Sequence, residues 1–279
     1  MHMAKDEVMN PNKALWEKGD FTRIAESMRE CGEDVARQAG ITSGMKVLDL
    51  GCGDGTTAIP AAKLGADVLG VDIAANLVAA GNRRAAQAGL SANCRFEEGD
   101  ACDLRLENKS FDLVVSMFGA MFAPKPFDVA REMVRVTRHG GRIIMGNWIP
   151  NDPTLVAQIL KISSSYSPPP PEGFVSPMGW GSTPNIIERF GAVGIASEAI
   201  SWERDSYVFD FKGSPAEFVD TFRQFYGPTM NAFDAAEKSG RTDELRNELV
   251  TLFQSQNQSQ YPNTCLIAAT YLKVTVEVG

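Results

Sequence analysis

The chain has 279 residues, of which 44% are hydrophobic, and its formal net charge is −8. This length and apolar content suffice for one large domain, or for a core domain with insertions. The absence of any lysine and arginine cluster argues against nucleic acid as a partner, and no apolar run is long enough for membrane insertion.

The five cysteines indicate neither a disulfide framework nor a metal site. They are scattered and contain no C-x-x-C pair: Cys31, Cys52, Cys94, Cys102 and Cys265. We therefore expect no metal and a cytoplasmic location, where thiols stay reduced. These features leave the oligomeric state open between monomer and homodimer.

The first predicted unit is an N-terminal helical cap, residues 1–40. Apolar side chains recur within it at helical spacing, among them Ile24, Met28 and Val35. From 41 to 149, short apolar strands alternate with helices. This alternation predicts an α/β domain with a parallel sheet that is covered on both faces.

A glycine-rich loop, "GCGDG" at 51–55, follows the first predicted strand, "KVLDL" at 46–50. Its glycines allow a ligand to approach the backbone closely. The spacing is G-x-G-x-G, whereas the dinucleotide-binding fingerprint is G-x-G-x-x-G. Asp49 and Asp54 would repel a pyrophosphate, so the loop favours a ligand that carries a positive charge, such as an ammonium or a sulfonium.

Two further acids end the next two predicted strands. Asp72 follows 21 residues after Gly51, where a carboxylate can accept both ribose hydroxyls of a nucleoside. Asp100 ends the third strand, where it can accept a hydrogen bond from an adenine amino group beside the N–H of Ala101. Open α/β sheets bind ligands at the carboxyl ends of their strands, so these residues together predict a nucleoside site.

The regular alternation breaks after residue 149. Residues 150–190 are expected to form a substrate-cover insertion, and their Ser/Pro/Gly-rich stretch 163–181 is not expected to be regular helix.

The last predicted unit, residues 191–279, completes the sheet. It should contain two long strands that can pair antiparallel, at 197–211 and 264–277. Between them lies a helical insertion of two helices, within 212–260.

These motifs resemble those of the class I S-adenosylmethionine-dependent methyltransferases. "VLDLGCGDG" matches the first motif of that family, "VLGVDIA" the second, and "EEGDACDL", "FDLVVS" and "RVTRHGGRIIMGNW" the later ones. The resemblance covers residues 40–148 and implies a Rossmann-like fold with a seven-stranded, mostly parallel sheet and an antiparallel last strand. It also implies that 41–149 is the core that binds S-adenosyl-L-methionine.

Three other stretches, "FGAMFAPKP", "GNWIPND" and "SPPPPEGF…WG", are similar to a bacterial subgroup near the ubiquinone/menaquinone C-methyltransferases, the type 11 family. The sequence after strand four differs from the quinone enzymes, so their substrate does not transfer to this chain. His139 stands where the family usually has proline.

The resemblance implies a cofactor-binding set of ten residues. They are Asp49, Gly51, Cys52, Gly53, Asp72, Ile73, Asp100, Ala101, Ser116 and Phe118. The glycine loop would follow the methionine part of the cofactor, Asp72 would hold the ribose, and the residues around Asp100 would frame the adenine. Ser116 to Phe118 would form the floor of the transfer site.

Aromatic residues are concentrated in the second half of the chain, where core packing explains most of them. An aromatic pocket built by the insertions is an equally good explanation for a subset. The predicted acceptor pocket consists of Phe118, Met121, Trp148, Tyr166, Trp180, Phe222 and Tyr226.

A general base is needed only if the acceptor carries a proton of high pKa. The two histidines, His2 and His139, lie at the start of the chain and in a turn, so we expect no histidine base. The acid–base candidates are Tyr166, Tyr207, Tyr226 and Asp205, and each can instead have a packing or surface role.

The sequence therefore predicts an S-adenosylmethionine-dependent methyltransferase for a small, partly apolar or aromatic acceptor that reacts through N, S, O or an activated carbon. The alternatives are a dinucleotide-binding oxidoreductase and a catalytically silent S-adenosylmethionine-binding module.

Overall fold

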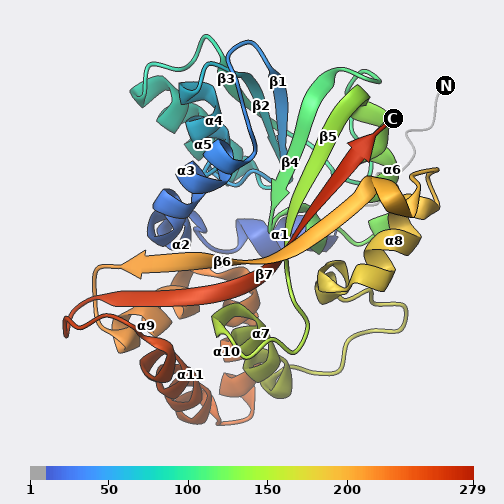
Figure 1. The fold of residues 1–279 in the computed structure, drawn as a ribbon. Coiled ribbons are helices and arrows are strands. Elements are labelled where there is room, and N and C mark those ends of the chain that lie inside the picture. Colours follow the sequence, from blue (N-terminus) through green and yellow to red (C-terminus); the bar gives the residue numbers. More distant parts are fainter. Residues whose placement is uncertain (1–10) are drawn as a thin grey trace, which may run out of the picture.

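The computed structural model describes residues 11–279, which form a seven-stranded sheet with helices around it (Figure 1). The strands are β1 (Lys46–Leu50), β2 (Asp67–Asp72), β3 (Cys94–Glu98), β4 (Phe111–Met117), β5 (Thr137–Trp148), β6 (Ile200–Phe211) and β7 (Cys265–Val278). Their order is β3-β2-β1-β4-β5-β7-β6. Strands β1 to β5 are parallel, and β7 is antiparallel to both β5 and β6. The predicted Rossmann-like sheet is confirmed.

Helices cover both faces of the parallel strands. One face carries α3 (Arg29–Gln38), α4 (Ala58–Lys63) and α5 (Ala75–Gln87), and the other carries α6 (Pro126–Val136) and α8 (Thr183–Gly191). Val47 and Leu113 belong to the buried cluster of the first face, whereas their neighbours Leu48 and Val114 belong to that of the second. This alternation follows from the two-residue period of a strand, and it explains why the strands are apolar throughout.

Strands β6 and β7 carry the sheet into a second, helical part of the molecule (Figure 1). Residues 271–278 of β7 pair with β5, whereas residues 265–270 pair with β6 alone. Around this end lie α7 (Leu155–Tyr166), α9 (Pro215–Phe225), α10 (Gly227–Lys238) and α11 (Thr242–Gln256). Within residues 11–279, no helix combines the length and the apolar character needed to cross a bilayer.

Two expectations for the helical part are wrong. Residues 163–166 belong to the last turn of α7, so regular helix continues into the Ser/Pro/Gly-rich stretch. The insertion between the long strands contains three helices, because the backbone of Tyr226 is extended and separates α9 from α10. Gly227 lies directly against Leu15 there, and a Cβ on Gly227 would be 2.4 Å from the Leu15 carbonyl oxygen.

The N-terminal segment connects the two parts of the molecule. It contains α1 (Pro11–Glu17), α2 (Thr22–Ala25) and the 3-10 turn η1 (Glu26–Met28). Lys13 of α1 forms an ion pair with Glu98 at the end of β3, and Lys18 forms one with Asp234 of α10, each at 2.5 Å. Residues 1–10 of the predicted cap, including His2, lie outside the described residues.

Candidate active site

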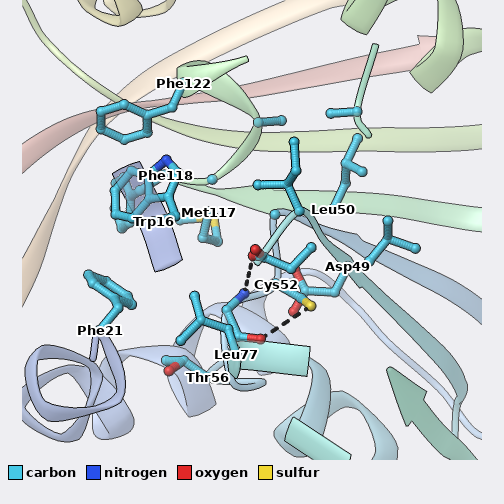
Figure 2. A pocket seen from close by; sticks show the side chains of 18 of the residues that line it. Trp16, Phe21, Asp49, Leu50, Cys52, Thr56, Leu77, Met117, Phe118 and Phe122 are labelled. Carbon is cyan, nitrogen blue, oxygen red and sulfur yellow. Dashed lines mark hydrogen bonds between the residues drawn. The ribbon is translucent and has the colours of Figure 1, made fainter. Parts of the chain in front are cut away.

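The loop between β1 and α4 opens onto a cavity at the carboxyl edge of the sheet (Figure 2). The N–H groups of Gly51 and Cys52 both donate to the carbonyl of Val71 in β2, at 2.7 and 3.2 Å. Gly53 has a φ of +55°, and a Cβ on it would meet only the Phe21 ring, at 3.9 Å. The loop therefore presents bare backbone to open space, where a ligand can approach it.

Asp49 is buried beneath this loop with one carboxylate oxygen unsatisfied. Its side chain is 2% exposed, and Oδ2 has no hydrogen-bond partner within residues 11–279. Burial raises the pKa of the Asp49 carboxyl to about 7; the hydrogen bond from the Ala58 N–H opposes this shift, and the nearby Asp72 adds to it. A buried charge without a partner is costly, so this position favours a ligand that supplies a hydrogen-bond donor or a positive charge.

Asp72 links the end of β2 to the glycine loop. Its Oδ2 accepts a hydrogen bond from the Gly53 N–H at 2.8 Å, and its Oδ1 accepts one from the Ala74 N–H at 2.9 Å. Burial raises the pKa of the Asp72 carboxyl, and these backbone donors oppose the shift. Each carboxylate oxygen has two lone pairs, so Asp72 can also accept hydrogen bonds from a ligand in the cavity that it lines.

Asp54 does not supply the free negative charge that was expected of it. The Arg29 guanidinium donates two hydrogen bonds to its carboxylate, at 2.8 and 2.5 Å, and Arg84 Nη1 lies 3.4 Å from Oδ1. The Asp54 side chain is buried, so this pairing compensates its charge within the protein. The expectation that Asp54 favours a cationic ligand is therefore wrong.

Nine of the ten predicted cofactor residues line this cavity, which we call the strand-edge cavity. They are Asp49, Gly51, Cys52, Gly53, Asp72, Ile73, Asp100, Ala101 and Phe118. Ser116 does not line it, because its side chain is buried between the end of β1 and the loop after β4. The Ser116 hydroxyl donates to the Leu50 carbonyl at 2.6 Å and accepts from the Ala120 N–H at 3.0 Å.

An apolar cavity, the aromatic chamber, adjoins the strand-edge cavity. Its lining comes from the N-terminal segment, the loop after β4, strands β5 and β6, and the helical part: Trp16, Phe21, Ile24, Met28, Phe118, Phe122, Trp148, Val156, Phe209, Phe222 and Tyr226. Five of these also line the strand-edge cavity and mark the junction: Trp16, Phe21, Met28, Phe118 and Phe122. Figure 2 shows four of them grouped across the cavity from Asp49.

Phe118 is fixed at this junction by the rings around it. It stacks on Trp148 with 3.7 Å between ring centroids, and its ring meets Tyr207 and Tyr271 edge-on at 5.0 and 5.2 Å. Its φ of +63° is uncommon for a bulky residue. The surrounding contacts hold this strained backbone in place.

The predicted acceptor residues divide into two groups. Phe118, Trp148, Phe222 and Tyr226 line the aromatic chamber. Tyr166, Trp180 and Met121 line neither cavity, and these three predictions are corrected. Tyr166 packs between α7 and α11, where its hydroxyl donates to Glu248 at 2.9 Å, and the other two are buried in the core.

The four acid–base candidates also divide. Asp205 accepts a hydrogen bond from the Tyr271 hydroxyl at 2.9 Å and lines neither cavity. Tyr207 lines the strand-edge cavity, but its hydroxyl donates to the Met28 carbonyl at 3.0 Å. Tyr226 lines the chamber, and burial raises its pKa, so the phenol stays protonated at neutral pH. Residues 11–279 contain no cluster of His, Cys, Asp and Glu suited to a metal.

Sequence reasoning missed the contribution of the N-terminal segment. Trp16, Phe21 and Met28 line both cavities. A usable signal was present, because Trp16 and Phe21 are an aromatic pair in the half of the chain that has few aromatic residues.

A family model described as a methyltransferase domain matches residues 47–141. Uncharacterized protein Rv1403c of Mycobacterium tuberculosis is 35% identical over 223 residues, which are 80% of this chain and 79% of that protein. Two named enzymes match over a shorter region. Tocopherol O-methyltransferase of Arabidopsis thaliana is 35% identical over 42% of this chain and 35% of that enzyme. Sterol 4-C-methyltransferase strm-1 of Caenorhabditis elegans is 28% identical over 46% of this chain and 38% of that enzyme.

Solved structures share the fold. The YcgJ protein of Bacillus subtilis has a TM-score of 0.57 and 19% identity, over 90% of this chain and 99% of its own. A phosphoethanolamine N-methyltransferase of Haemonchus contortus, solved with S-adenosylhomocysteine, has a TM-score of 0.60 and 16% identity, over 96% and 60%.

The fold and these matches define an S-adenosyl-L-methionine-dependent methyltransferase. Within that class, the chain has the class I fold, carries a methyltransferase domain at residues 47–141 and belongs to the same family as the mycobacterial protein Rv1403c.

Proposed function

We propose that the strand-edge cavity holds S-adenosyl-L-methionine, and that the acceptor is a small, partly apolar or aromatic molecule bound in the aromatic chamber. The observation that carries the proposal is the link between Asp72 and Gly53. In this link a strand-end carboxylate and bare loop backbone line one cavity, with an apolar chamber beside them, and this supports a ribose-binding role for Asp72.

The residues of the strand-edge cavity suit each part of the cofactor. We assign the methionine end to the Gly51–Gly53 backbone and to Asp49, whose unsatisfied oxygen would accept from the cofactor ammonium. Asp72 would accept from the ribose hydroxyls. Ile73, Asp100 and Ala101, at the ends of β2 and β3, would frame the adenine. When bound, the cofactor supplies an activated methyl group.

The aromatic chamber supports an acceptor with an apolar body. Its lining contains no acidic or basic side chain. Two relatives named for a sterol and a tocopherol, both largely apolar molecules, agree with this assignment. The protein's part in the reaction would be to exclude water and to align the acceptor, and alignment can contribute about 7–11 kcal/mol.

Calorimetry tests the proposed cofactor site. We expect S-adenosylmethionine and S-adenosylhomocysteine to bind in the micromolar range, whereas NAD should not bind. Binding of NAD without binding of S-adenosylmethionine would establish the oxidoreductase alternative instead. A silent module would bind the cofactor but would transfer no methyl group to any member of an acceptor panel.

A further inference from the structure

The charge pattern of the two cavities restricts the acceptor further. We propose that the acceptor is an uncharged molecule whose apolar part lies against Trp16, with its reactive atom at the junction of the two cavities. This inference rests on the proposed function, because it describes the chamber that adjoins the proposed cofactor site.

The chamber contains no group that could neutralise a charged acceptor. Its polar groups are the Tyr226 hydroxyl and the indole N–H groups of Trp16 and Trp148. Neither the Tyr226 hydroxyl nor the Trp148 indole N–H has a hydrogen-bond partner within residues 11–279, and both side chains belong to residues that are about 95% buried or more. An ion placed there would lose its hydration without gaining a counter-ion.

Anions are disfavoured for a second reason. The strand-edge cavity on the other side of the junction is lined by four acids, Asp49, Asp54, Asp72 and Asp100. Arg29 compensates Asp54, and the cavity lining itself contains no lysine or arginine. The side chains of this lining would therefore supply no counter-ion to a carboxylate or phosphate on the acceptor.

Cations could in principle bind to the faces of aromatic rings. Here the rings of the lining lie in contact with one another. Trp16 meets Phe21, Phe122 and Tyr226 in edge-on contacts, with centroid distances of 5.8, 4.9 and 5.9 Å. Trp148 covers one face of Phe118. The lining supplies no carboxylate to support an ammonium group, so an uncharged apolar surface is its best match.

Trp16 belongs to the N-terminal segment and lines both cavities. Its ring contacts side chains from the loop after β4 and from the helical part, as well as Phe21 of its own segment. Removal of this ring would join the cavities and admit water to the apolar surface. We therefore assign Trp16 a role in acceptor binding and specificity.

A matched set of fluorescent probes tests the charge rule. N-phenyl-1-naphthylamine is uncharged, and 8-anilinonaphthalene-1-sulfonate adds a sulfonate to the same rings. N-(1-naphthyl)ethylenediamine carries an ammonium group and is compared with its uncharged counterpart, N-ethyl-1-naphthylamine. Each is titrated into the full chain, with and without S-adenosylhomocysteine. We expect the uncharged probes to bind, and each charged probe to bind at least about tenfold more weakly than its uncharged counterpart. Equal or tighter binding of a charged probe, or no binding of the uncharged ones, overturns the proposal.

Two tryptophan variants locate the probe. Trp16→Ala should weaken binding of the uncharged N-phenyl-1-naphthylamine about fivefold or more, whereas Trp202→Ala, at an exposed position on β6, should leave it unchanged. Trp16→Leu replaces the alanine variant if that variant does not fold. Equal affinities in the Trp16 and Trp202 variants would overturn the role of Trp16. A separate titration with S-adenosylhomocysteine tests the cofactor site, so failure of the proposed function is distinguishable from failure of the charge rule.

Discussion

Gly51 and Gly119 meet backbone to backbone at the carboxyl edge of the sheet. A Cβ on Gly119 would lie 2.2 Å from the Gly51 carbonyl oxygen, and one on Gly51 would lie 2.6 Å from the Gly119 Cα. The loops after β1 and β4 therefore approach more closely than side chains would allow. This contact sets the position of the glycine loop relative to Phe118, the residue before Gly119.

We expect Gly119→Ala to displace the glycine loop and to weaken S-adenosylmethionine binding about tenfold or more. Overpacking of this kind costs about 1–3 kcal/mol of stability. The matched control is Gly191→Ala in α8, where a Cβ would meet nothing within 4 Å. Calorimetry and thermal unfolding of both variants give the comparison, and equal cofactor affinities would contradict the prediction.

Asp72→Ala should weaken cofactor binding by about 1.5–3 kcal/mol, the range for hydrogen bonds to a charged group. Because Asp72 also accepts from the Gly53 N–H, the variant should lose some stability as well. Asp67→Ala, at the exposed opposite end of the same strand, is the control. If the dissociation constant is the same in both variants, Asp72 does not bind the ribose.

The raised pKa of Asp49 predicts how the stability of the ligand-free protein depends on pH. The unfolded carboxyl titrates at about 3.9, whereas in the folded state its pKa is about 7. The folded state binds more protons between these values. The contribution of protonated Asp49 to the free energy of unfolding is therefore fully present below about pH 4, and it is lost as the pH rises through 7.

Asp49→Asn removes this titration. Relative to wild type, the variant should gain stability between pH 5 and pH 8, by at most about 3 kcal/mol. Denaturant unfolding at the two pH values measures the difference, and Asp67→Asn serves as the exposed control. A difference between wild type and Asp49→Asn that does not change with pH would show that the Asp49 carboxyl is not protonated in the folded protein.

Tyr226→Phe and Tyr166→Phe separate the chamber from the surrounding helices. We expect Tyr226→Phe to change kcat/KM for the acceptor, because it removes a hydroxyl that lacks a protein partner in the chamber, while the cofactor Kd stays within about twofold. Tyr166→Phe should change neither, because its hydroxyl binds Glu248 outside both cavities. Steady-state kinetics on any accepted substrate, with calorimetry for the cofactor, decides. The same acceptor kinetics in both variants would remove Tyr226 from the acceptor site.

The cofactor half of the site could be predicted because its signals are local. A strand, a glycine loop and a strand-end acid such as Asp72 each occupy a few consecutive residues, and parallel topology brings them to one edge. The prediction that Ser116 lines the cofactor cavity was wrong. Its hydroxyl instead contacts Leu50, which is 66 residues away in the sequence, and a local pattern does not reveal such a contact.

The acceptor half could not be predicted in the same way, because it depends on contacts between distant segments. Trp16 contacts Tyr226, which lies more than 200 residues away in the sequence, and no local pattern predicts that contact. Tyr166 lies on the side of α7 that packs on α11, and the helical pattern does not show which neighbour each side of a helix meets. The Arg29–Asp54 pair escaped notice for the same reason.

The long strand β6 contributes one residue to each of the two cavities and sets the distance between those residues. Tyr207 lines the strand-edge cavity, and Phe209, two residues further on the same face, lines the aromatic chamber. Their separation is therefore about 7 Å, two residue steps along a strand. Pairing with β7 keeps this part of β6 extended, and β7 in turn pairs with β5. The helices around the chamber can differ in length or sequence among relatives without altering that distance, whereas one residue inserted between Tyr207 and Phe209 would turn Phe209 away from the chamber.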